Sequence, residues 1–205
     1  MGQKRRGTAA LADAEASEEW DDGRAMQAVA RRDARAFRWL VDRHARALFR
    51  VAYRMLGDRA EAEDVVQESL LRLWDHAAGW QPSGGGLPAW LRRIATNRCL
   101  DRVRRTQRLS DEKVPERADD ASPADAMLDA DARDVAATRA LQALPDRQRA
   151  AVVLTYYEEL GNAHAAEALG MKLKAFESLL HRARAALRAH VEAAGITADM
   201  LRGAP

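Results

Sequence analysis

The chain has 205 residues, a formal net charge of only +2 and a single cysteine. The lone cysteine excludes an internal disulfide and a zinc site built on cysteines. No apolar run approaches the roughly 18 residues of a membrane span, and the N-terminus lacks the apolar core of a signal peptide. These features predict a cytoplasmic protein without membrane insertion, made of one ordinary domain or two small ones.

The near-neutral total hides an uneven distribution of charge. Leu87–Arg108 holds seven arginines against Asp101, for a net charge of +6. Lys172–His190 has a net charge of +4, and Ser110–Asp134 between them has a net charge of −6. One basic helix alone is often just a solvated face, but two such helices favour contact with nucleic acid.

Helical periodicity begins near Ala34, after residues 1–23, which show none and are predicted to be disordered. Apolar residues from Phe37 to Met55 recur at spacings of three and four, which predicts a helix over 34–56. Gly57 is a typical C-cap, and Asp58 with Glu61 three positions later forms a capping-box pattern for the next helix. That helix should bury Ala62, Val65, Val66, Ser69, Leu70, Leu73 and Trp74.

A loop rich in glycine follows, with Trp80 and Gly84–Gly86, and Pro88 suits the first turn of the upstream basic helix. Trp74 and Trp90 lie on apolar stripes and are predicted to be core residues. Trp80, in the loop, is the better candidate for stacking on an unpaired base.

The last third of the chain, Leu144–Arg188, reads as the helix-turn-helix layout of a DNA reader. Pro145 and Asp146 open a helix, and the recognition helix begins near Lys172. Its leading side chains are placed for base edges, whereas Arg182, Arg184 and Arg188 suit phosphates. The predicted core of this unit includes Tyr156 and Leu173 beside Phe176, Leu179 and Leu180.

The fold class predicted from these elements is all-α, with two small helical domains joined by a flexible acidic linker. The predicted boundaries are a disordered tail at 1–23, a first bundle at 24–108, the linker at 109–134, a helix-turn-helix unit at 135–193 and a tail at 194–205.

No constellation of catalytic residues is present. The five histidines are scattered, and no phosphate-binding loop or dinucleotide fingerprint occurs. Glu61, Asp64 and Glu68 share a helical face without a partner that would make them metal ligands, and Cys99 is expected to be a small core residue. No catalytic residue, metal or cofactor is therefore predicted.

Three runs of sequence carry a family resemblance: AEDVVQESLLRLW (62–74), WLRRIATNRCLDRVRR (90–105) and LPDRQRAAVVLTYYEEL (144–160) followed by LLHRARAALR. Together they resemble bacterial RNA polymerase sigma factors of the extracytoplasmic-function group, over residues 33–188. The resemblance implies a promoter-specificity subunit, not an enzyme, with region 2 in the first unit and region 4 in the second. It also implies core RNA polymerase, promoter DNA and an anti-sigma factor as partners.

The resemblance assigns roles to positions of this chain. The face that binds core polymerase would comprise Asp64, Gln67, Glu68 and Leu71. The residues that contact minus-ten DNA would be Trp80, Ser83, Asn97, Arg98, Asp101, Arg102 and Arg105. The residues that contact minus-35 DNA would be Lys172, Lys174, Glu177, Ser178, His181, Arg182 and Arg184. The acidic linker matches the segment that passes near the RNA exit path.

The chain departs from the family pattern in three places. It has His164-Ala165-Ala166 where Glu-Ile-Ala is usual, Glu177 where a basic residue is usual, and extra glycines in the loop Trp80–Leu87, which in the family captures a flipped base of the minus-ten element. Glu177 either accepts a hydrogen bond from a cytosine amino group or pairs with Lys174 or His181.

Two other functions remain open from the residues alone. A stand-alone helix-turn-helix regulator would need a dimer interface and a palindromic site, and would leave the acidic face unexplained. A helical-bundle metalloenzyme would need ligands that the sequence does not supply.

Overall fold

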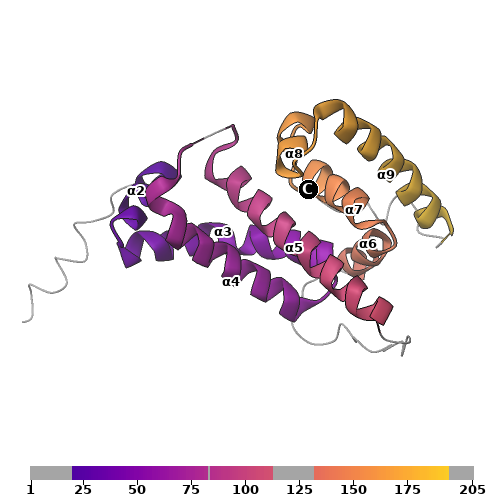
Figure 1. Cartoon of the computed structure of the whole chain (residues 1–205), viewed down its shortest axis with the longest axis horizontal. Coiled ribbons are helices and arrows are strands. Elements are labelled where there is room, and N and C mark those ends of the chain that lie inside the picture. Colours follow the sequence, from indigo (N-terminus) through magenta and orange to yellow (C-terminus); the bar gives the residue numbers. More distant parts are fainter. Residues whose placement is uncertain (1–19, 83, 113–131, 194–205) are drawn as a thin grey trace, which may run out of the picture.

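The computed structural model describes residues 20–82, 84–112 and 132–193, and within them it contains helices and no strand (Figure 1). The first unit consists of α2 (Asp22–Ala30), α3 (Ala34–Leu56), α4 (Arg59–His76), the short 3-10 turn η1 (Ala77–Gly79) and α5 (Gly86–Glu112). The second consists of α6 (Ala132–Gln142), α7 (Asp146–Val152), the π-helical turn η2 (Val153–Tyr157), α8 (Asn162–Ala168) and α9 (Leu173–Ala193). The all-α prediction is confirmed.

The ends of α3 and α4 follow the local signals in the sequence. Gly57 has a φ of 73°, the left-handed conformation that glycine adopts without a steric penalty, and its N–H donates to the carbonyl of Tyr53. One residue later, the carboxylate of Asp58 accepts from the N–H of Glu61 at 2.9 Å. The tight link between these two caps places α4 directly against α3.

The helices extend beyond the predicted boundaries. α2 begins at Asp22, where the carboxylate of Asp21 caps the N–H of Arg24, so the last residues of the predicted tail are folded. The segment is too short for periodicity to reveal it. α5 continues to Glu112 and α6 begins at Ala132, which shortens the predicted linker at both ends. The rest of the linker and tails lies outside the described residues.

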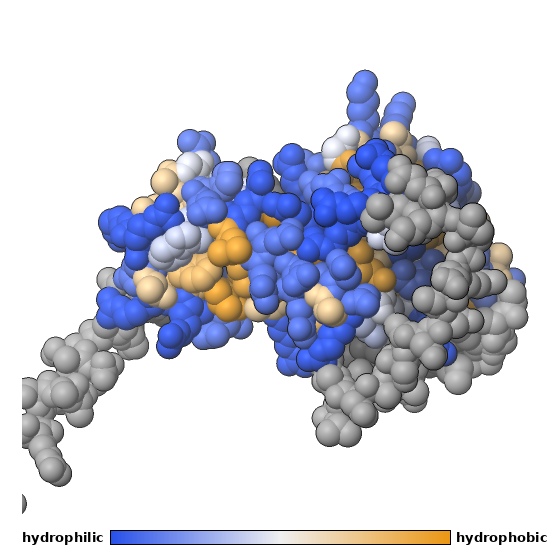
Figure 2. All heavy atoms as spheres, turned by 60° about the horizontal axis from the view of Figure 1, so that its bottom comes forward, coloured by the Kyte–Doolittle hydropathy of each residue, from blue (hydrophilic) through white to orange (hydrophobic). Residues whose placement is uncertain are grey.

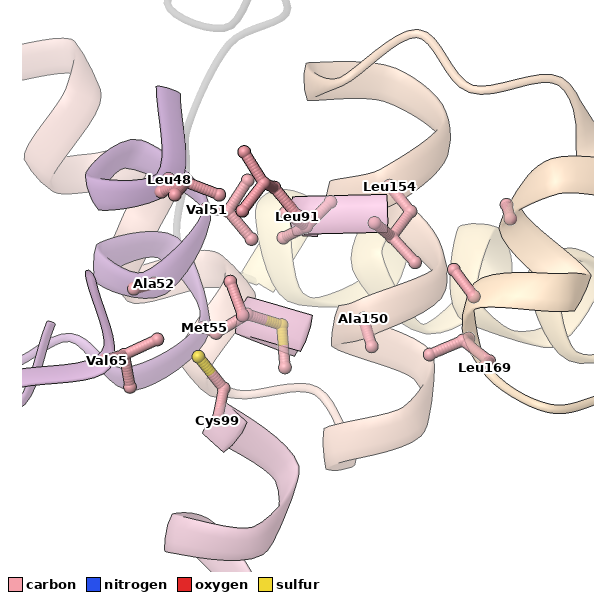
Figure 3. Close-up of a cluster of buried hydrophobic side chains, with 14 of the residues drawn as sticks. Leu48, Val51, Ala52, Met55, Val65, Leu91, Cys99, Ala150, Leu154 and Leu169 are labelled. Atoms are coloured by element: carbon pink, nitrogen blue, oxygen red, sulfur yellow. The ribbon is translucent and has the colours of Figure 1, made fainter. Parts of the chain in front are cut away.

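A single apolar core runs through both units (Figure 3). Met55 of α3, Leu91 and Cys99 of α5, and Ala150 and Leu154 of the second unit belong to the same buried cluster. Helices α3 and α5 both contact α7, and α5 also contacts α8, so the two units form one packed body.

Arg149, at the centre of this junction, is almost fully buried. Its guanidinium donates to the carbonyls of Leu141 at 3.0 Å and Leu144 at 3.1 Å, and to that of Met55 in the first unit. Burial lowers the pKa of Arg149. Arg149 therefore ties the C-terminal end of α3 to α7 by donating to backbone carbonyls of both units.

Most of the predicted core residues of the second unit are buried, including Phe176, Leu179 and Leu180. The prediction was wrong for Tyr156 and Leu173, which are exposed. Tyr156 lies in the π-helical turn, where the wider winding shifts side chains off the 3.6-residue stripe. Leu173 is the first residue of α9, at the edge of the turn.

Candidate nucleic-acid interface

The outer face of α4 combines acidic, polar and apolar side chains. Asp64, Gln67 and Leu71 recur at helical spacing and are all exposed, and the side chain of Leu71 is 60% exposed. Among the described residues, Leu71 is the most exposed of the large hydrophobic residues. Figure 2 shows that the visible surface is mostly hydrophilic, with a hydrophobic patch over the first unit.

Glu68, predicted for the same face, is instead held by the neighbouring helix. Its carboxylate accepts from Arg102 Nη2 at 2.9 Å and from Arg102 Nη1 at 3.3 Å, and Arg98 Nη1 lies 3.3 Å away. Arg102 Nε donates to the second carboxylate, Glu61 Oε2, at 2.7 Å. The hydrogen bond from Arg102 lowers the pKa of Glu68, and the same bond raises the pKa of Arg102.

This ion-pair network borders a hollow of about 350 Å³ between α4 and α5. The structure thus brings residues predicted for polymerase binding and residues predicted for minus-ten binding to one place. The hollow is lined by Glu61, Asp64, Glu68, Arg98, Asp101, Arg102, Arg105 and Thr106. The family resemblance gave no role to Glu61 or Thr106, although Glu61 was predicted to share a helical face with Asp64 and Glu68.

The remaining α5 residue, Asn97, is exposed but does not line this hollow. Ser83 lies outside the described residues.

Trp80 borders a second hollow, which lies at the junction of α2 and η1. It lines a space of about 320 Å³ together with Met26, Gln27, Ala30, Arg31, Ala77 and Ala78. Trp80 is half-buried and packs partly against the apolar core. Trp74 is a structural residue, since its ring packs edge-on to Phe37 at 5.1 Å and under the guanidinium of Arg32. That Trp80 stacks on an unpaired base stays a prediction.

Helix α9 presents its predicted DNA-binding residues on the exposed side. Phe176, Leu179, Leu180 and Ala183 face the core, whereas all seven predicted minus-35 residues are exposed. Glu177 is exposed, and among the described residues it forms no ion pair with Lys174 or His181. Arg184 differs from the others because it lies over the ring of Tyr156 and donates to its hydroxyl.

Two of the departures from the family pattern meet in space. A Cβ atom added at Gly84 would lie 2.9 Å from Nε2 of His164, so the glycine loop closely approaches the start of α8. The extra glycine and the unusual histidine therefore accommodate one another across the two units.

Within the described ranges, no helix is long and apolar enough to cross a membrane. The same residues contain no group of three or more histidine, cysteine, aspartate or glutamate side chains placed to hold a metal ion.

Comparison with known proteins assigns both units to one family. Sigma-70 region 2 matches residues 40–109, and Sigma-70, region 4 matches residues 134–187. The ECF RNA polymerase sigma factor SigE of Mycolicibacterium smegmatis is 39% identical over 158 residues, which are 73% of this chain but only 59% of that relative. SigL of Mycobacterium tuberculosis is 35% identical over 181 residues, covering 84% of this chain and 98% of the relative.

A solved structure agrees with these matches. The sigma factor RpoE, in a complex with the anti-sigma factor NepR from Bartonella quintana, has a TM-score of 0.59 and 25% identity, covering 76% of this chain and 96% of that one. The chain belongs to the ECF group of the sigma-70 family of RNA polymerase sigma factors.

Proposed function

We propose that this protein is a promoter-specificity subunit that binds core RNA polymerase and directs initiation at promoters with minus-35 and minus-ten elements. The observation that carries this proposal is the exposed face of Asp64, Gln67 and Leu71 on α4. This face lies beside the arginine-rich helix α5, and a second basic helix, α9, belongs to the other unit. A regulator that only binds DNA would leave this acidic face and its exposed leucine without a role. The protein is not itself catalytic, because RNA synthesis belongs to core polymerase, and it acts in the cytoplasm.

The two basic helices have different tasks in this proposal. The exposed side of α9 reads duplex DNA in the major groove, with Lys172, Lys174, Glu177, Ser178 and His181 toward the bases. Helix α5 and Trp80 hold the separated minus-ten strand, because arginines bind phosphates and an aromatic ring stacks on an unpaired base. Arg182 adds sequence-independent affinity through phosphate contact.

Control by an anti-sigma factor is part of the proposal. The similar RpoE structure is a complex with an anti-sigma factor. A partner of this kind would act by covering the surfaces that polymerase and DNA need. The exposed Leu71 offers it an apolar anchor on the polymerase-binding face.

The test is co-purification of the tagged full chain with bacterial core RNA polymerase. Asp64→Arg is compared with Glu63→Arg, since both residues are exposed neighbours on α4 and both substitutions change the charge equally, but only Asp64 lies on the proposed face. We expect stoichiometric binding by wild type and Glu63→Arg, and loss of binding by Asp64→Arg. A folded wild-type chain that ignores polymerase but binds palindromic duplexes tightly would instead be an autonomous regulator.

A further inference from the structure

Arg102 is the most covered of the arginines along the middle of α5. Its side chain is 19% exposed, against 40% for Arg98 and 53% for Arg104. Three of its N–H groups point at carboxylates of α4, one toward Glu61 and two toward Glu68. In this position the guanidinium is directed at the protein's own acidic side chains and not at a nucleic-acid strand.

Glu68 is shared between two arginines of α5. Arg98 and Arg102 both lie within 3.3 Å of its carboxylate oxygens. The same residue lies one turn beyond Asp64, at the edge of the face proposed for polymerase. A cationic partner that docks on this face competes with the two arginines for the same oxygens, because a carboxylate has a limited number of lone pairs.

We propose that Glu61 and Glu68 mask Arg102 in the free chain, and that a basic surface docking on Glu68 releases Arg102 for the phosphates of the single strand. The inference rests on the proposed function, since the docking surface is that of core polymerase. It gives a physical reason for α4 and α5 to carry their opposite charges face to face. Polymerase binding and strand binding are then linked, and each strengthens the other by the same factor.

A substitution at Glu61 can test the masking of Arg102 without altering the proposed polymerase-binding face. Glu61 lies outside the proposed polymerase face, and its carboxylate contacts Arg102. Glutamine at this position keeps the side-chain shape and the backbone N–H that Asp58 caps. Glu61→Gln therefore weakens the mask with little effect on the helix.

The experiment measures binding of the free full-length chain to fluorescent oligothymidylate, in which any phosphate contact is independent of sequence. We expect Glu61→Gln to bind roughly two- to fivefold tighter than wild type, as befits one partly shielded ion pair. The slope of log affinity against log salt should steepen by up to about 0.7, the value for one whole additional phosphate on a single strand, because Glu68 still holds Arg102 part of the time. Glu63→Gln is the matched control, because Glu63 is on the same helix and pairs only with Arg59 among the ion pairs of the described chain.

The double variant Glu61→Gln/Arg102→Gln decides whether the gain passes through Arg102. The gain should vanish in the Arg102→Gln background. Persistence of the gain there, or an equal gain in Glu63→Gln, would overturn the proposal in favour of a general charge effect. Weaker binding by Glu61→Gln would overturn it too, since the carboxylate would then position Arg102 for DNA.

A second measurement tests the competition for Glu68. Arg102→Gln should bind core polymerase more tightly than wild type, because it removes one competitor for the carboxylate. Weaker binding would mean that Arg102 orders Glu68 for polymerase, which contradicts the proposal. Failure of the wild-type chain to bind polymerase at all would refute the proposed function, and the oligothymidylate result would show separately whether Arg102 is masked.

Discussion

Arg92 and Glu158 form an ion pair between the two units of the chain. Arg92 Nε, in α5, donates to Glu158 Oε2 at 2.6 Å, just after the π-helical turn of the second unit. The side chain of Glu158 is only 2% exposed, so water contributes little to its solvation. Glu158 Oε1 has no hydrogen-bond partner in the structure, which leaves Arg92 as the main compensation for burying the carboxylate.

Removing Arg92 should therefore destabilise the fold. Arg92→Ala leaves a buried carboxylate without its cation, and we expect the free energy of unfolding to fall by about 3 kcal/mol. Arg93→Ala is the control, because Arg93 is the exposed neighbour on the same helix and should change stability by no more than about 0.5 kcal/mol. Urea titrations followed by circular dichroism measure both values. Equal losses in the two variants would show that the pair does not hold the units together.

Replacing Arg149 by lysine should destabilise the fold, although the positive charge is kept. Its planar guanidinium reaches the carbonyls of Leu141, Leu144 and Met55 together. A lysine ammonium cannot match this geometry and would leave buried carbonyls unpaired. We expect Arg149→Lys to cost about 2 kcal/mol in urea denaturation. Arg147→Lys, two residues earlier and exposed, should stay close to wild type, and an equal cost there would refute the assignment.

Local signals in the sequence were sufficient for the long helices of the first unit and for the link between α3 and α4, but not for α2 or for the end of α5. Gly57 and Asp58 are adjacent, and each acts on residues within one turn, so the boundary between α3 and α4 could be predicted. The buried stripe of α9 could be predicted for the same reason. At Tyr156 this reasoning failed, because periodicity assumes an unbroken α-helix and the π-helical turn changes the winding.

Contacts between distant residues could not be predicted from one sequence. Periodicity showed that Glu61 and Glu68 lie on a polar face. It did not show that α5 would cover this face with Arg102, which is 41 residues after Glu61 and 34 residues after Glu68 in the chain. The shared core around Cys99 is a similar case. The sequence suggested two separate domains with a flexible linker, whereas the junction depends on side chains such as Arg149 that satisfy carbonyls of both units.

Cys99 should make stability depend on alkaline pH. Burial raises the pKa of its thiol to about 12, from an ordinary value of 9.0. Because the folded pKa is raised, the contribution is complete below pH 9 and is lost as pH rises toward 12, by about 1.4 kcal/mol per pH unit. Other groups titrate in this range, so the measured quantity is the difference in unfolding free energy between wild type and Cys99→Ala. Above pH 9 the unfolding free energy of wild type should fall steadily relative to that of Cys99→Ala. A difference that stays constant with pH would contradict the burial of the thiol.

Cys99 should also resist alkylation in the folded chain. The thiolate is the reactive form, and a fully buried thiol with a raised pKa supplies almost none at neutral pH. Iodoacetamide should therefore label the protein fast in urea and very slowly in buffer, as measured by intact-mass spectrometry. Rapid labelling in buffer would show that the junction around Cys99 opens readily.

Glu177 should determine base preference, because it is exposed on α9 and has no ion pair among the described residues. A carboxylate in the major groove accepts from the amino group of cytosine. Glu177→Gln should change the preference at one base pair by about 1–3 kcal/mol in binding to a randomised duplex library. Arg182→Gln is the matched comparison, since loss of a phosphate contact should weaken all sequences alike and reduce the salt slope by about 0.9. The assignment fails if Glu177→Gln strengthens binding to every duplex equally, because the carboxylate then only repels the DNA backbone.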